Sequence, residues 1–214
     1  MKMYLRFLVL PAVVLIVAAC ASSGVKRSSR AASTMKRTTE IVSGAQKQVD
    51  ANNAALDRLL ASGGNDLRKS FDAYAKQVSR TRDLADDLTA AHSDMNRSRD
   101  DYFKGWAADA ASIQDPELKR LALERQARLN ERTVALVDAF AGMKDSIDTY
   151  RVSLTDVQKF LTNDLTDSGI ETLRSTGKVN QVKSDGERLK ERLAEAERVL
   201  AELRTLIGPG AAGL

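Results

Sequence analysis

Cys20 carries the only thiol in the chain, and a thiolate can be acylated, oxidised or bound to a metal. With no second cysteine, a disulfide within one chain is excluded. Cys20 ends the run Val17-Ala18-Ala19-Cys20, which follows an apolar stretch from Phe7 and the basic residues Lys2 and Arg6. This order of basic, apolar and small residues is typical of a secretory signal, and the apolar run is shorter than the roughly 20 residues that a spanning helix needs.

The last four residues of this segment resemble the bacterial lipobox, in which the thiol receives a diacylglyceryl group after cleavage before the cysteine. By this resemblance residues 1–19 are a lipoprotein signal peptide and Cys20 is the lipidation site, which anchors the protein to a membrane through several acyl chains. The alternative is an ordinary signal peptide, because Ala19-Cys20-Ala21 also fits the A-x-A rule and cleavage after Ala21 would remove the cysteine. In a Gram-negative lipoprotein, Ala21 in place of Asp predicts the outer membrane, facing the periplasm.

The other residues with chemical potential do not form a recognisable site. His92 is the only histidine and has no Glu-x-x-His motif beside it, which predicts no metal site. Carboxylate neighbours such as Asp86-Asp87 and Asp100-Asp101 point in different directions on a helix and read as solvated faces. No glycine-rich phosphate loop and no Ser-His-Asp arrangement is present, so we expect a non-enzymatic protein with no cofactor and no small-molecule substrate.

Charge excludes one class of partner and leaves a second open. Removal of Lys2 and Arg6 from the 33 basic residues leaves 31 against 29 acidic ones, and this net charge of +2 predicts no nucleic-acid surface. Five basic residues interleaved with serines precede the first acid, Glu40: Lys26, Arg27, Arg30, Lys36 and Arg37. We therefore expect residues 20–34 to form a flexible basic tether after the lipidated Cys20. Such a tether is either a solvated linker or a contact to anionic headgroups.

Helical periodicity dominates the rest of the chain. Pro116 is the only proline between residues 35 and 207, aromatic residues make up 5% of the chain, and apolar residues recur in steps of three and four. The second of four such segments shows the pattern best, with Phe71, Tyr74, Val78, Thr81, Ala85, Leu88, His92, Met95, Arg99, Tyr102, Trp106, Ala110 and Ile113. The sequence predicts an all-α fold: an elongated antiparallel four-helix coiled-coil bundle over residues 35–207, with a disordered tail at 208–214.

Three aromatic residues lie within five positions near the turn at Pro116: Tyr102, Phe103 and Trp106. They could contact a partner or a membrane, but Tyr102 and Trp106 also fit the apolar seam and could be core residues covered by the end of the fourth helix. Phe103 lies off the seam and is the better contact candidate. A first helix that starts at Met35 would end about 25 Å short of Pro116, so this hairpin tip is expected to project toward the membrane or a partner.

Two blocks of this body resemble a known family. The run from Asp156 to Leu165, followed by Ile170 and Leu173, and the pattern Phe103-x-x-Trp106 with Ile113, Leu118 and Arg120 are similar to the proteobacterial family called domain of unknown function 2959. The likeness covers roughly residues 33–207 and implies a helical envelope lipoprotein with no known activity. Gly169 stands where a helix former is expected, which leaves the start of the fourth helix open.

The sequence therefore predicts a lipid-anchored periplasmic coiled-coil protein that acts as a scaffold, spacer or adaptor and binds envelope proteins or itself. The alternative is a membrane-contacting or lipid-binding protein that uses the basic tether and the aromatic tip.

Overall fold

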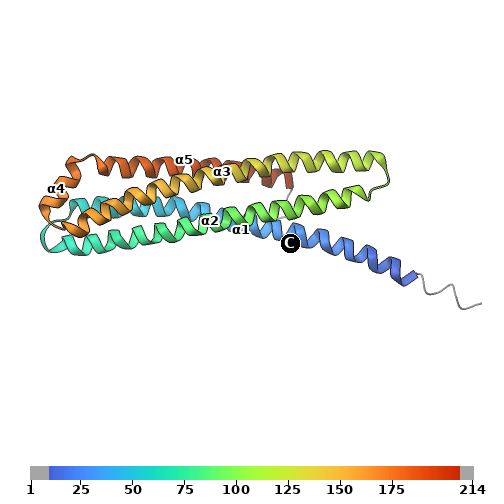
Figure 1. Cartoon of the computed structure of the whole chain (residues 1–214), viewed down its shortest axis with the longest axis horizontal. Coiled ribbons are helices and arrows are strands. Elements are labelled where there is room, and N and C mark those ends of the chain that lie inside the picture. Colours follow the sequence, from blue (N-terminus) through green and yellow to red (C-terminus); the bar gives the residue numbers. More distant parts are fainter. Residues whose placement is uncertain (1–9, 208–214) are drawn as a thin grey trace, which may run out of the picture.

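The computed structural model describes the backbone of residues 10–207 and the side chains of residues 26–206 except residues 28 and 65. The described elements are α1 (Leu10–Ala61), the short 3-10 helix η1 (Gly64–Asp66), α2 (Leu67–Ala111), α3 (Pro116–Asn163), α4 (Asp167–Ser175) and α5 (Lys178–Ile207). The four long helices lie side by side and alternate in direction (Figure 1). The all-α helical bundle is thus confirmed. The predicted tail at 208–214 and residues 1–9 of the signal segment lie outside the described residues.

The predicted apolar seam forms the core. On α2, the side chains of Phe71, Tyr74, Val78 and Leu88 are buried, and on α3 the run from Leu136 to Leu161 is buried at the same three- and four-residue steps. Such spacing keeps one helix face in contact with its neighbours over many turns, and burial of that face stabilises the rod.

A polar layer interrupts the seam toward the C-terminal end of α1. Asn52 is fully buried, and its Nδ2 donates to Thr81 Oγ1 of α2 at 2.8 Å, while Gln48 Nε2 donates to Asn52 Oδ1 at 3.3 Å. A buried amide that finds partners only in one alignment fixes the register of α1 against α2.

Residues 20–34 are not a flexible tether, because α1 runs through them without a break. Three arginines of α1 lie opposite acids of α2: Arg27 pairs with Asp109, Arg30 Nη1 is 4.0 Å from Asp101 Oδ2, and Arg37 Nη1 is 3.3 Å from Asp94 Oδ2. These pairs hold the basic segment on α2 in an antiparallel register. Met35 lies short of Pro116 along the rod, as expected, because nearby Arg37 pairs with Asp94; the first helix, however, begins before Met35, at Leu10.

The predicted fourth helix is two helices. The helical conformation is interrupted at Gly177, whose φ of +69° favours glycine. This interruption separates α4 from α5. The structure explains why glycine occupies position 169: a Cβ there would lie 2.2 Å from the carbonyl oxygen of Asp164. Thr166 Oγ1 accepts from Gly169 N at 3.0 Å and caps α4, so a helix former at 169 would disrupt this turn.

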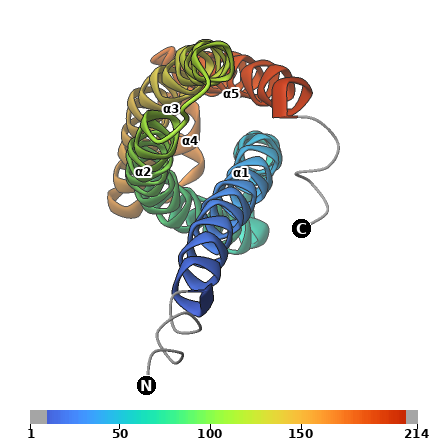
Figure 2. The same ribbon diagram turned by 90° about the vertical axis from the view of Figure 1, so that its right-hand side faces the viewer.

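All four long helices pack together only in the part of the rod away from the α2–α3 turn. Lys183 Nζ lies 2.6 Å from Asp57 Oδ1 and Lys190 Nζ lies 2.6 Å from Asp50 Oδ1, so α5 meets α1 along the distal part of α1. Viewed end-on, α1, α2, α3 and α5 form an open arc (Figure 2). Toward the turn α1 diverges from the hairpin in both views, and α5 stops short of the turn in Figure 1.

Candidate contact site at the α2–α3 tip

The turn between α2 and α3 is stabilised by the N-terminal cap of α3. Asp115 Oδ1 accepts from the backbone nitrogen of Leu118 at 2.8 Å, and Pro116 occupies the first position of α3, as the sequence predicts. Because the turn is short and capped, the end of α2 and the beginning of α3 form a rigid hairpin. We call residues 102–125 the tip hairpin.

The predicted aromatic residues gather on the α2 side of the tip hairpin. Tyr102, Phe103 and Trp106 are all partly exposed. The Tyr102 ring lies edge-on to its two neighbours, with centroid distances of 5.3 Å to Phe103 and 5.7 Å to Trp106. Edge-to-face contacts of this kind stabilise aromatic pairs beyond their buried area. The three residues therefore form one cluster.

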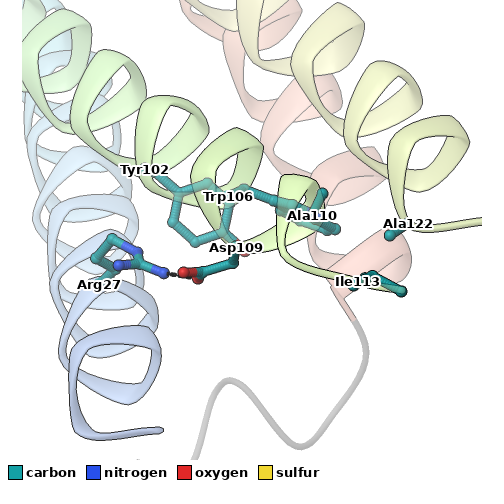
Figure 3. Close-up of a pocket in the computed structure, with 7 residues that line it drawn as sticks. All are labelled: Arg27, Tyr102, Trp106, Asp109, Ala110, Ile113 and Ala122. Atoms are coloured by element: carbon teal, nitrogen blue, oxygen red, sulfur yellow. Dashed lines mark hydrogen bonds and ion pairs between the residues drawn. The ribbon is translucent and has the colours of Figure 1, made fainter. Parts of the chain in front are cut away.

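An open groove of about 410 Å³ lies beside this cluster (Figure 3). It is lined by Arg27 of α1, by Tyr102, Trp106, Asp109 and Ala110 of α2, by Ile113 of the turn and by Ala122 of α3. The lining residues come from three helices and the turn, and α5 does not supply one of them. Tyr102 and Trp106 are only partly buried, and on the groove side they are not covered by α5. Phe103 is not among the lining residues.

One ion pair borders the groove. Arg27 reaches across from α1 to the Asp109 carboxylate, and the two side chains are 25% and 54% exposed (Figure 3). Burial raises the pKa of the Tyr102 hydroxyl, and the charges of Arg125 and Arg27 oppose this rise only in part. Tyr102 therefore stays protonated at neutral pH. The groove combines an apolar floor with one paired charge at its edge, which suits binding better than acid–base chemistry.

Leucines on the α3 side of the tip hairpin are a feature that sequence reasoning missed. Leu118 is 60% exposed, Leu121 45% and Leu123 43%, although leucine is usually buried in a bundle. They are exposed because α5 ends nearby: Arg125 Nη2 donates to the Leu206 carbonyl at 3.4 Å, so about 13 Å of α3, from Pro116 to Glu124, extends past α5. The available signal in the sequence was Gly208-Pro209, a helix stop directly after Ile207.

The remaining candidates lie elsewhere on the rod. The backbone of Cys20 lies in α1, and its side chain is outside the described ones. His92 is partly exposed, and its ring nitrogen Nε2 lies 3.2 Å from Asn96 Nδ2. Among the described residues no group of three or more His, Cys, Asp and Glu side chains could hold a metal ion. Within the same part of the chain, none of the helices has the length and apolar character that membrane crossing requires.

Neither a curated protein nor a solved structure matches the chain. A family model does match, from residue 18 to residue 204, so that Cys20, the aromatic cluster and nearly all of the helical bundle lie inside the matched region. The match covers far more than half of the 214 residues. The chain therefore belongs to the family described as protein of unknown function DUF2959.

Proposed function

We propose that the protein is a non-enzymatic, lipid-anchored periplasmic scaffold, spacer or adaptor, attached to the outer membrane through Cys20. One observation carries the proposal: the anchor residue and the exposed tip hairpin lie at the same end of a helical rod. Cys20 precedes Arg27 by seven residues, about 10 Å along α1. Because Arg27 pairs with Asp109, Cys20 falls level with the turn at 112–116.

The rod gives this anchor a mechanical meaning. Helix α2 has 45 residues and α3 has 48, so each is roughly 70 Å long. Continuous packing along the seam makes the rod stiff, and α1 continues as a helix through the segment that joins the anchor to the bundle. A protein built in this way can hold its two ends at a fixed separation, which suits a spacer or a scaffold for other envelope proteins.

The alternative membrane-contacting function receives less support from the charges. Arg27, Arg30 and Arg37, which would bind anionic headgroups, lie against acids of α2. The end of the tip hairpin carries two acids, Asp115 and Glu117, balanced by Lys119 and Arg120, so it presents no net positive charge to an anionic surface. Without net positive charge, the tip hairpin fits a protein partner better than a negatively charged bilayer.

The anchor is tested by cell fractionation and N-terminal mass spectrometry of wild type and Cys20→Ser, with Ser23→Ala as the matched control. We expect wild type and Ser23→Ala in the membrane fraction with an acylated N-terminal cysteine, and Cys20→Ser in the soluble fraction or unprocessed. A mature chain that begins at Ser22, with Cys20→Ser unchanged in location, would establish the ordinary signal peptide and remove the anchor.

The contact role of the tip hairpin is tested by crosslinking in cells followed by mass spectrometry. We expect Trp106→Ala to lose crosslinked envelope partners that Val152→Ala keeps, because Val152 is an exposed α3 residue far from the groove. Liposome flotation of the unlipidated protein tests the alternative. Binding to vesicles that is lost on Phe103→Ala would favour the membrane-contacting function instead.

A further inference from the structure

The exposed leucines of α3 continue a face that binds another helix. Leu118, Leu121, Arg125 and Arg132 are spaced by three, four and seven residues and so share one side of α3. Further along, this side meets α5: Arg125 contacts the Leu206 carbonyl, and Arg132 Nη1 lies 3.3 Å from Glu202 Oε2. Leu118 and Leu121 are therefore helix-packing residues that no described helix covers, because α5 is described only as far as Ile207. We call Leu118, Leu121 and Arg125 the tip face.

The charges beside Leu121 are arranged so that the tip face complements itself. Glu117, Leu121 and Arg125 stand four residues apart, in the order acidic, apolar, basic. An identical helix that crosses in the opposite direction about Leu121 presents this order reversed. Each Glu117 then faces Arg125 of the other copy, while the two Leu121 side chains meet at the centre. In the single chain Glu117 accepts from Arg120, and Arg125 donates to the Leu206 carbonyl. Both side chains are exposed, so this pairing needs an exchange of side-chain partners but no unfolding.

We propose that a second copy of this chain packs on the tip face, with the two α3 helices crossing antiparallel about Leu121. The contact is isologous, so it closes as a dimer and does not propagate into a filament. The rods extend in opposite directions from a shared centre near the two tip hairpins. Formation of this dimer does not require the lipid anchor. If Cys20 is acylated, both anchors lie near the centre and can enter one bilayer.

The contact is small, and weak association in solution is expected for an interface of this size. Attachment of both copies to one membrane would raise their effective concentration and favour the dimer without any new contact.

The first test is disulfide trapping in the full chain carrying Cys20→Ser, which removes the only native thiol. Leu121→Cys places the new thiol on the two-fold axis, and Val152→Cys, 52% exposed on the same helix, is the matched control. We expect Leu121→Cys to form covalent dimers about tenfold faster than Val152→Cys under mild oxidation, because prior association raises the effective thiol concentration. Equal rates would overturn the proposal.

The second test uses charge reversal in the Leu121→Cys background. Glu117→Arg alone, or Arg125→Glu alone, turns two symmetry-related attractions into repulsions and should slow trapping about tenfold. The double variant Glu117→Arg with Arg125→Glu restores the opposite charges and should restore the rate. Circular dichroism confirms that each variant remains helical. Failure of the double variant to recover, or vesicle binding by a chain whose Leu121→Cys form does not dimerise, would overturn the antiparallel contact.

Discussion

The guanidinium of Arg27 on α1 forms an ion pair with the carboxylate of Asp109 on α2, across 82 residues of sequence. Two further pairs, Arg30 with Asp101 and Arg37 with Asp94, continue the line along the same two helices. Single exposed ion pairs contribute little, but a row with matched register can hold a short helical segment in place. The basic run thus aligns α1 on α2 and borders the groove at the tip hairpin.

Reversal of one charge in this row should loosen the start of α1. We expect Asp109→Arg to speed amide hydrogen exchange in residues 21–34 about threefold, because loss of the pair plus repulsion from Arg27 costs roughly 0.7 kcal/mol locally. The double variant Arg27→Asp with Asp109→Arg should recover most of the protection. Exchange rates that are the same in all three proteins would show that apolar packing alone holds this segment.

The reason that the sequence suggested a tether is that helix formation there depends on distant partners. Locally, residues 20–34 contain serines and unopposed basic residues, which are typical of linkers. The acids that pair with Arg27 and Arg30, which are Asp109 and Asp101, belong to another helix. By contrast, the seam of α2 is visible in the sequence because that segment carries its own three- and four-residue spacing. The predicted seam residues from Phe71 to Leu88 are all buried, whereas Tyr102, Trp106 and Ile113, nearer the tip, are only partly buried.

For a similar reason, only the aromatic part of the candidate site could be predicted from the sequence. Tyr102, Phe103 and Trp106 stand out by residue type, and the structure gathers them into one cluster. Leu118 and Leu121 look like ordinary core leucines, and their exposure depends on the point at which α5 ends beside them. That relationship joins residues some 80 positions apart and cannot be read from either segment alone.

Gly169 is expected to be irreplaceable where Gly44 is not. A Cβ at position 169 would lie 2.2 Å from a backbone oxygen, so Gly169→Ala should shift the capped turn before α4 and destabilise the protein by about 2 kcal/mol or more. Gly44 lies inside α1, where a Cβ would meet no neighbouring atom within 4 Å, so Gly44→Ala should stabilise the helix by up to about 1 kcal/mol. Urea unfolding of the two variants beside wild type measures both effects. A neutral Gly169→Ala would contradict the need for glycine in this turn.

Loss of the buried amide at position 52 should be costly. Asn52→Ala leaves a cavity and removes one partner from Thr81 and one from Gln48, for which we expect a loss of about 1–3 kcal/mol in the free energy of unfolding. Asn130→Ala is the matched control, because Asn130 is exposed on α3, and it should change stability by less than about 0.5 kcal/mol. Chemical denaturation measures the free energy of unfolding of both variants. Equal losses of stability would show that the polar layer contributes nothing specific.

Tyr74 should make the rod sensitive to alkaline pH. Its hydroxyl is buried between α2 and α3 and donates to the Leu154 carbonyl at 3.0 Å. Burial raises the pKa of Tyr74 far above its ordinary value of 10.0, and the charge of Tyr150 makes a smaller contribution in the same direction. Above pH 10.0 the unfolded chain releases this proton while the folded chain keeps it, so the stabilisation is complete below that pH and falls as the pH rises.

Substitution Tyr74→Phe separates this effect from the titration of lysines. At pH 8 we expect the variant to be less stable by about 1 kcal/mol, because the hydrogen bond to Leu154 is lost. Above pH 10.0 wild type should lose up to about 1.4 kcal/mol per pH unit more than the variant, so the two unfolding curves should converge near pH 11. Curves that stay equally far apart from pH 8 to pH 11 would show that Tyr74 ionises in the folded rod as readily as in the unfolded chain.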